Sequence, residues 1–399
     1  MDKPITLRIV SALLVVLLLA GCNGASRKGT PSKPKPKPKP LVLASKAEEL
    51  NTKLDEAAKA AGCVGASLVA FENGEITYTH HYGYANKAKK QAPDDQTQYR
   101  IASLSKLVTA VTIMKMVDGG IINLDEDIST YLKYQVRNPS HKDTPITMRM
   151  LLSHSSSVFD GDSFNKSTGQ YMSNKKLLTA KSNFQGYEPG KGYEYSNFGI
   201  QAAGAVAELA TNAKFHDYAR ENIFKPMEIT AEYLASELED SSHMAVIYNQ
   251  NGAVSRSVKQ QLGPKRFRPL GELQGVTQSS LTITPGDYAK IIIMLVNGGE
   301  YKGTRILSAE SAAEILKTQY SDEKVIYCLC VRKNSKLVDG RELYLHSGEA
   351  FGILSAFAFD AESKSGAVVV TNGAKTKKDE ATGLFTGCRD MLGGIFEYI

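Results

Sequence analysis

The sequence lacks an apolar run long enough to form a permanent transmembrane helix. The run from Ile9 to Ala20 has twelve residues and is interrupted only by Ser11, whereas a spanning helix needs about 20. Of the 399 residues, 42% are hydrophobic and 23% are charged, which are ordinary values for a globular protein. These values exclude a disordered chain, a collagen-like fibre and a multi-span membrane protein, and the length allows one large domain or two to three small ones.

The chain also lacks an excess of positive charge in its body. The formal net charge is +6, but residues 1–21 contribute +1 and residues 22–40 contribute +6. The remaining 359 residues therefore carry a net charge of −1. A groove for a phosphate backbone needs clustered lysine and arginine, so the charge distribution argues against a nucleic-acid partner.

Cysteine is scarce, and neither cysteine nor histidine occurs in pairs at zinc-ligand spacing. Cys328 and Cys330 are separated by one residue, which is not a zinc pattern. On the strand expected here, their side chains face the same side and do not easily bond each other. A disulfide from this pair to Cys63 or Cys388 and four free buried thiols stay open as alternatives. We expect no metal site and no cofactor.

The N-terminal residues have the pattern of an export signal. A short positive region precedes the apolar run, which ends in Leu19-Ala20-Gly21-Cys22. This ending resembles the bacterial lipobox, in which the cysteine becomes the lipidated first residue of the mature protein. The resemblance implies a lipoprotein signal peptide over residues 1–21 and a membrane anchor at Cys22, outside the cytoplasm. A plain signal peptide with an incidental cysteine is the alternative, and the choice between inner and outer membrane stays open.

Residues 22–45 are expected to form a lipidated, Lys/Pro-rich tether. Four consecutive Lys-Pro pairs run from Lys33 to Pro40, and proline alternation favours extended polyproline II at about 3.1 Å per residue. Such a tether would hold the remaining domain, residues 46–399, away from a membrane and toward the cell wall. A merely solvated linker is the alternative.

Strand patterns occur at both ends of the body, and helix patterns lie between them. We expect an early hairpin that turns at Asn73-Gly74, a buried helix over 103–117, and helices and loops over 125–320. The other expected elements are helices over 47–61 and 378–398 and strands over 64–71, 75–82, 325–331, 342–346, 353–359 and 366–371. They predict an α/β (α+β) fold: one antiparallel sheet formed by both chain ends, flanked by helices, with an inserted helix-rich subdomain.

A serine and a lysine lie three residues apart where the buried helix begins. In Ser103-Leu104-Ser105-Lys106, this spacing places a hydroxyl and an amine on one helix face. A serine nucleophile needs a nearby base, and a helix N-terminus favours developing negative charge. The spacing alone is weak evidence, because five serines of the chain precede a lysine by three. Only Ser103 opens a long apolar helix.

Two further short patterns complete the candidate site. Tyr195-Ser196-Asn197 precedes another apolar helix, and His346-Ser347-Gly348 ends a late strand. In this order, the three patterns resemble the active-site motifs of the serine β-lactamase and penicillin-binding protein family. The resemblance is closest to the branch of class C β-lactamases, D,D-carboxypeptidases and related esterases. It covers roughly residues 46–399 and includes the segments Arg100–Ser103, Gly120–Asp125, Met150–Ser155, Ile223–Met227 and Asn297–Gly299.

The resemblance implies that Ser103 attacks a carbonyl carbon and forms an acyl-enzyme, which water then hydrolyses. Lys106 and Tyr195 would share the proton transfer, and Asn197 would orient Lys106 or the substrate. Lysine and tyrosine both have pKa values near 10 in water. Either residue can act as a base at pH 7 only if its pKa falls by about three units, which corresponds to about 4 kcal/mol. Which of the two residues is the base stays open.

The resemblance also implies how the substrate is held. The backbone N–H groups of Ser103 and Glu349 would form an oxyanion hole, where losing one donor typically costs about a hundredfold or more in rate. His346, Ser347 and Gly348 would bind and orient the substrate.

Three residues depart from the pattern of the family. His346 stands where many β-lactamases have lysine, and an unperturbed histidine is mostly neutral at pH 7. Glu349 adds negative charge near the pocket, which we expect to disfavour anionic acyl donors. Ser157 occupies a position that is usually glycine, in the loop after His154. We expect the His154 side chain to hold this loop in place. These departures bear on the substrate and not on the nucleophile.

The leading prediction is a membrane-anchored, extracytoplasmic serine hydrolase that acts on D-amino-acid cell-wall peptides or related small amides and esters. A β-lactamase or a broad esterase is the alternative. A non-catalytic lipoprotein that binds peptidoglycan or a protein partner in the same cleft is a third reading. The sequence does not indicate an oligomeric state.

Overall fold

The computed structural model describes residues 42–168, 170–263 and 268–399. The predicted signal peptide, the Cys22 lipid anchor and almost all of the tether lie outside these residues. Among the helices of the described ranges, none is both long enough and apolar enough to cross a membrane.

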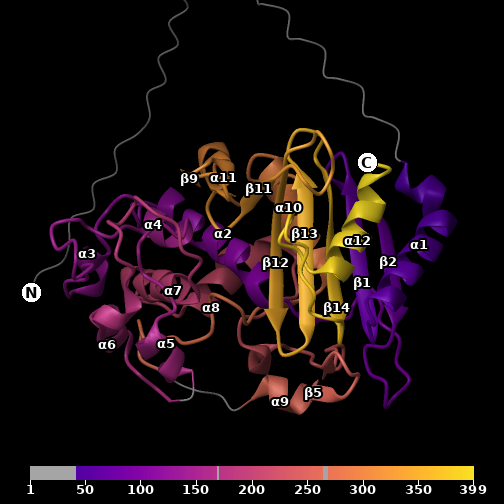
Figure 1. Ribbon diagram of the computed structural model, residues 1–399, viewed down its shortest axis with the longest axis horizontal. Helices are drawn as coiled ribbons and strands as arrows, with labels where there is room; N and C mark the ends of the chain where they lie inside the picture. Colours follow the sequence, from indigo (N-terminus) through magenta and orange to yellow (C-terminus); the bar gives the residue numbers. More distant parts are fainter. Residues whose placement is uncertain (1–41, 169, 264–267) are drawn as a thin grey trace, which may run out of the picture. The chain divides into compact units, whose positions relative to one another are not determined.

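Eight antiparallel strands form the central sheet, in the order β2-β1-β14-β13-β12-β11-β10-β9 (Figure 1). The first strand, β1, pairs with the last, β14, so that Val69 lies opposite Val368. Both strands are buried along their whole length. The expected sheet built from both chain ends is thus confirmed. Its strands are β1 (Gly65–Glu72), β2 (Glu75–Gly83), β9 (Tyr320–Ser321), β10 (Ile326–Tyr327), β11 (Arg332–Asn334), β12 (Leu343–Ala350), β13 (Ile353–Asp360) and β14 (Ser365–Asn372).

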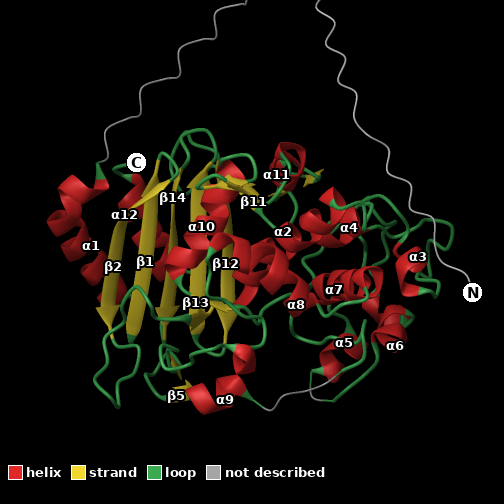
Figure 2. Ribbon diagram, turned by 180° about the vertical axis from the view of Figure 1, so that it is seen from behind, coloured by secondary structure: helices red, strands yellow, loops and turns green. Residues whose placement is uncertain are grey.

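Alternate residues of the central strands pack against helices on the two faces of the sheet. Leu68 belongs to the apolar cluster that includes α1 (Ala47–Ala60) and α12 (Thr386–Phe396). Its neighbour Val69 belongs to the larger cluster that includes α2 (Ser105–Asp118) and α10 (Pro285–Val296). Figures 1 and 2, seen from opposite sides, show α12 and α10 on opposite faces of the sheet. Successive side chains of a strand point to opposite faces, so both faces are apolar and covered.

The middle of the chain forms the expected helix-rich half beside the sheet (Figure 2). Its α7 (Asn197–Thr211) is buried over most of its length and packs against α2 and α4 (Met148–Leu152). The other helices are α3 (Ile128–Leu132), α5 (Asp162–Ser167), α6 (Asn174–Leu178), α8 (Phe215–Ala219), α9 (Val258–Leu262) and α11 (Ala309–Leu316). Small ladders join β3 (Tyr99–Arg100) to β6 (Thr282–Ile283), β4 (Ile247–Tyr248) to β5 (Val254–Arg256), and β7 (Glu300–Tyr301) to β8 (Thr304–Arg305).

The strand expected over 342–346 continues to Ala350, so His346-Ser347-Gly348 lies within β12 and not at its end. Two further predicted elements are shorter than expected. The strand expected over 325–331 is two short strands, because the Cys328 N–H donates to the Val331 carbonyl at 2.7 Å and Cys330 has a left-handed φ of 57°. A tight turn therefore separates β10 from β11. The helix expected over 378–398 is only α12, since the Asp379 carboxylate accepts from backbone N–H groups that follow it and holds a loop there. The four cysteines of the described residues are free and buried.

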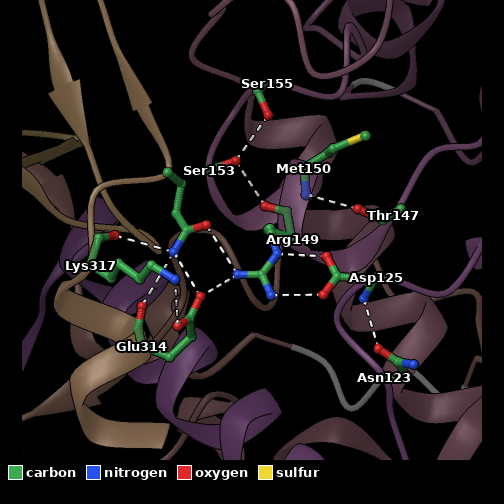
Figure 3. Close-up of polar contacts among 10 residues, drawn as sticks. Asn123, Asp125, Thr147, Arg149, Met150, Ser153, Ser155, Glu314 and Lys317 are labelled. Atoms are coloured by element: carbon green, nitrogen blue, oxygen red, sulfur yellow. Dashed lines mark hydrogen bonds and ion pairs between the residues drawn. The ribbon is translucent and has the colours of Figure 1, made fainter. Parts of the chain in front are cut away.

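Arg149 on α4 ties the helix-rich half to the end of the sheet (Figure 3). Its Nε and Nη2 donate to the two oxygens of Asp125 at 2.6 and 2.8 Å. Its Nη1 contacts Glu314 on α11 and donates to Oε1 of Gln319, just before β9, at 3.0 Å. Ser153 donates to the Arg149 carbonyl at 2.8 Å, where the loop toward the candidate site begins. One guanidinium thus connects three segments that are distant in sequence.

We expect Arg149→Met to lower the free energy of unfolding by about 1–2 kcal/mol. Asp125 loses its cation in this variant, and the part-buried Glu314 keeps only the 3.6 Å contact with the exposed Lys317. Lys225→Met is the matched control, since it removes an exposed ion pair with Glu221 and should change stability by less than about 0.5 kcal/mol. Urea denaturation measures both. Equal losses in the two variants would show that Arg149 is only a surface charge.

Candidate active site

Ser103 lies in a 3₁₀ turn, Ala102–Leu104, that leads directly into α2. Ala102 has a left-handed φ of 51°, which is unusual for a residue other than glycine. Ser105 fixes this turn: its hydroxyl donates to the Ala102 carbonyl at 2.6 Å and accepts from the Leu281 N–H at 3.1 Å. Ala102 and Leu104 are buried, whereas Ser103 is partly exposed. The turn therefore presents the Ser103 hydroxyl and hides its neighbours.

Lys106 lies one helical turn beyond Ser103 and is fully buried. Its Nζ is 3.0 Å from Ser103 Oγ, 2.8 Å from Asn197 Oδ1 and 2.8 Å from the Gln278 carbonyl oxygen. No carboxylate of the described residues lies within 4.0 Å of it, and burial lowers the pKa of Lys106 to about 7. A neutral amine donates two hydrogen bonds and has one lone pair. The oxygens of Asn197 and Gln278 accept these two hydrogen bonds. The lone pair of the Lys106 nitrogen is therefore free to accept the proton of the Ser103 hydroxyl.

Tyr195 contacts both residues from the segment before α7. The Lys106 Nζ lies 5.0 Å from the centroid of its ring. Burial raises the pKa of Tyr195 above its ordinary value, and the neighbouring Ser103 side chain lowers it by less. At neutral pH, the phenol therefore keeps its proton and can donate it. The sequence left the choice of base open, and these opposite pKa shifts favour Lys106.

Asp160 is a site residue that the motifs missed. Its Oδ2 accepts from Asn197 Nδ2 at 2.8 Å, and its Oδ1 accepts from the Phe198 N–H at 2.8 Å. This contact orients the Asn197 amide so that Oδ1 faces Lys106. Asp160 lies in a loop without motif or periodicity, and Gln278 lies 172 positions after Lys106. Only the folded chain brings them to the amine.

Gly348 allows β12 to approach the nucleophile. A Cβ at this position would lie 2.9 Å from the Ser103 nitrogen and 2.8 Å from the Ile101 oxygen, so a larger residue would push the strand away. The partly exposed Ser347 donates to the Gly383 carbonyl at 3.4 Å. Glu349 is exposed and lines the cavity. The oxyanion hole made by the Ser103 and Glu349 N–H groups stays a prediction.

His346 is buried and neutral rather than presented to a ligand. Its Nδ1 donates to the Ser347 carbonyl at 2.8 Å, so its Nε2 accepts from the Tyr327 hydroxyl at 3.3 Å. Burial, with Lys106 and Arg332 nearby, lowers the pKa of His346 to about 3. Its ring lies 5.9 Å from that of Tyr195. In this position His346 supports the aromatic residues around the site.

The loop after α4 carries His154 and Ser157. His154 accepts from the Ser196 N–H at 3.2 Å and packs 4.6 Å from the Tyr195 ring, and burial holds its pKa well below the ordinary value. Ser157 has a left-handed φ of 66°, the conformation that glycine adopts readily. Its hydroxyl accepts from Asn138 at 3.0 Å. This hydrogen bond offsets part of the strain.

A cavity of about 960 Å³ opens beside the nucleophile and is lined by Ser103, Asn197 and Gln278. At its far end, His216, Asp217 and Glu237 lie close enough to share a metal ion. Arg220 already pairs with both carboxylates, at 2.7 Å from Asp217. Arg220 also pairs with Glu232, so a guanidinium already engages the carboxylates of this cluster.

We expect the reaction of Ser103 with a fluorophosphonate to depend on the neutral form of Lys106. Below pH 7, the second-order rate should fall about tenfold per pH unit, and above pH 7 it should level off. Stopped-flow labelling between pH 5 and 9 measures this, with Lys106→Met as the control that loses both rate and pH dependence. A flat profile, or a rise centred above pH 9, would contradict the assignment of the base.

Comparisons with known proteins identify chains of similar sequence and similar fold. Protein flp of Staphylococcus aureus (strain MRSA252) is 26% identical over 211 residues, which cover 52% of this chain and 42% of that protein. The match thus spans less than half the length of this curated relative. The octameric penicillin-binding protein homologue from Pyrococcus abyssi superposes with a TM-score of 0.69 at 19% identity, over 86% of this chain and 76% of that chain.

The D-amino acid amidase from Ochrobactrum anthropi SV3 has the same fold, with a TM-score of 0.67 at 23% identity over 88% of this chain and 98% of that chain. The family model described as beta-lactamase matches residues 50–385, which is most of the chain. The chain therefore belongs to the beta-lactamase family of serine hydrolases, together with homologues of penicillin-binding proteins.

Proposed function

We propose that this chain forms an acyl-enzyme at Ser103 and acts on D-amino-acid cell-wall peptides or related small amides and esters. The contact that carries the proposal is the 3.0 Å approach of the Lys106 Nζ to Ser103 Oγ. Lys106 takes the hydroxyl proton as Ser103 attacks the carbonyl carbon. Tyr195 gives a proton to the leaving group, and the amine or alcohol departs. Water then attacks the ester on Ser103 and releases the acid.

The charges around the site favour a leaving group that carries a free carboxylate over one that carries no charge. His346 is neutral, but Arg332 is mostly buried, close enough to Tyr195 and His346 to affect their charged forms. Within the described residues, no carboxylate lies within 4.0 Å of Arg332, so its charge is not cancelled locally. It can attract the free carboxylate at the end of a peptide. The resemblance to a D-amino acid amidase favours the same class of acyl donor.

The anchor and location are part of the proposal and are based on the sequence. We infer that Cys22 is lipidated after removal of residues 1–21, and that the Lys/Pro-rich tether holds the enzyme outside the cytoplasm near the cell wall. Globomycin treatment of expressing cells tests this. It should leave a precursor larger by the signal peptide, and Cys22→Ser should do the same.

A β-lactamase or broad esterase is the second candidate function. The size of the cavity, about 960 Å³, admits acyl donors other than peptides. These activities share the acylation step of the family. They differ in how fast water hydrolyses the ester on Ser103. A binding lipoprotein without catalysis is the third candidate, and the low pKa of Lys106 argues against it, since a mere binding site has no need for a neutral buried amine.

Intact-mass spectrometry of the protein with a penicillin and, separately, with a fluorophosphonate distinguishes these functions. We expect a stable penicillin adduct on Ser103 that is absent in Ser103→Ala. Labelling by the fluorophosphonate alone would favour an esterase, and consumption of penicillin without a lasting adduct would favour a β-lactamase. No adduct and no turnover with either probe would overturn the acyl-enzyme mechanism.

A further inference from the structure

A phenylalanine lies between two arginines at the mouth of the cavity. Phe351 follows β12, is 46% exposed and has a left-handed φ of 58°. The guanidinium carbons of Arg100 and Arg256 lie 5.1 and 4.6 Å from the centroid of its ring. Arg100 and Phe351 line the same cavity as Ser103. Both cation–π contacts are favourable, and they hold two cations beside one exposed ring at the mouth of the cavity.

The group is held in place by the surrounding backbone. Gly352 packs so tightly on the β4–β5 hairpin that a Cβ there would lie 1.9 Å from the Tyr248 carbonyl oxygen. The Tyr248 N–H in turn donates to Asn372 Oδ1, on β14, at 3.0 Å. This hairpin carries Arg256. The hairpin and the β12–β13 turn are thus fixed against each other, and Arg256 with them.

Both arginines have unused donors. Arg100 donates from Nε to the Ser279 carbonyl at 3.0 Å, and Arg256 makes no ion pair. Over the described part of the chain, no carboxylate lies within 4.0 Å of either guanidinium. Burial and the charge of Arg256 lower the pKa of Arg100 to about 10, so Arg100 remains cationic at pH 7. Glu349, which the sequence led us to expect to disfavour anionic acyl donors, lines the same cavity together with three other acids. None of these four carboxylates pairs with the two arginines.

The position of Tyr195 tells which part of a substrate reaches this group. The leaving group must lie near its proton donor. The Tyr195 ring lies 5.9 Å from that of His346, which precedes Gly348 by two residues on β12. Phe351 lies three residues beyond Gly348 in the other direction, about 10 Å away at about 3.3 Å per residue. A substrate that lies along β12 therefore extends its acyl portion, and not its leaving group, toward Phe351.

We propose that Arg100, Phe351 and Arg256 form a subsite for a carboxylate on the acyl portion of the substrate, about 10 Å from the scissile carbonyl. The two guanidinium groups supply planar donors that match a carboxylate, and the ring shields the contact from water. The inference rests on the proposed acyl-enzyme function. It narrows the substrate class to acyl groups with a distal negative charge.

Two p-nitrophenyl esters test the subsite with the full-length protein. One has an eight-carbon acyl chain that ends in a carboxylate, and the other has the same chain ending in a primary amide. The ratio of their acylation rates should favour the carboxylate in the wild type. In Arg256→Gln, it should fall about tenfold while the rate with the amide stays unchanged. Higher ionic strength should weaken the preference, because Arg256 is partly exposed.

Arg256→Gln is the deciding variant, because Arg256 is on a surface hairpin, whereas Arg100 adjoins the nucleophile turn. Arg305→Gln, at an exposed ion pair with Glu300, is the matched control and should leave the ratio unchanged. An unchanged ratio in Arg256→Gln would overturn the subsite while the adduct on Ser103 still supports the proposed function. Absence of any adduct with both esters would overturn the proposed function itself.

Discussion

The primary amine of Lys106 is fully buried. The atoms in contact with it are neutral hydrogen-bond acceptors, and no carboxylate of the described residues contacts it. Asn197 and Gln278 accept its two hydrogens, while the nearest acid, Asp160, holds Asn197 and does not reach the amine. A carboxylate in contact with Lys106 would stabilise the ammonium form and raise its pKa. The site therefore separates the amine from the acid by one amide, so that the amine is oriented and yet remains neutral near pH 7.

This arrangement depends on elements from both halves of the molecule. α2 supplies Lys106, and β12 closes the site at Gly348. Tyr195 lies just before α7, and Asn197 is the first residue of that helix. The nucleophile turn fits against β12 only because Gly348 has no side chain. The pairing of β1 with β14 brings the two ends of the chain into one sheet, and α2 packs in the large apolar cluster on one of its faces. Catalytic geometry is thus set by long-range packing rather than by any single segment.

The features that the sequence predicted correctly are those with local causes. The three-residue spacing of Ser103 and Lys106 brings them together because a helical turn does so in any context. Alternation and apolar runs likewise predicted the sheet and the buried helix. By contrast, Asp160, Arg332 and Gln278 meet the site through loops or distant strands that carry no periodicity. The strand predicted over 325–331 failed for a related reason: its apolar run conceals the turn at Cys330, whose left-handed backbone has no glycine to reveal it.

The central claim is that burial makes Lys106 neutral near physiological pH, and its titration can be observed directly. The protein would be labelled with [ε-¹³C]lysine, and the Lys106 signal would be assigned by its loss in Lys106→Met. NMR spectra between pH 5 and 11 should show this one carbon titrating with a midpoint near 7, far below the exposed lysines. A midpoint above 9 would contradict the account, because the amine would then be charged at pH 7 and unable to accept the Ser103 proton.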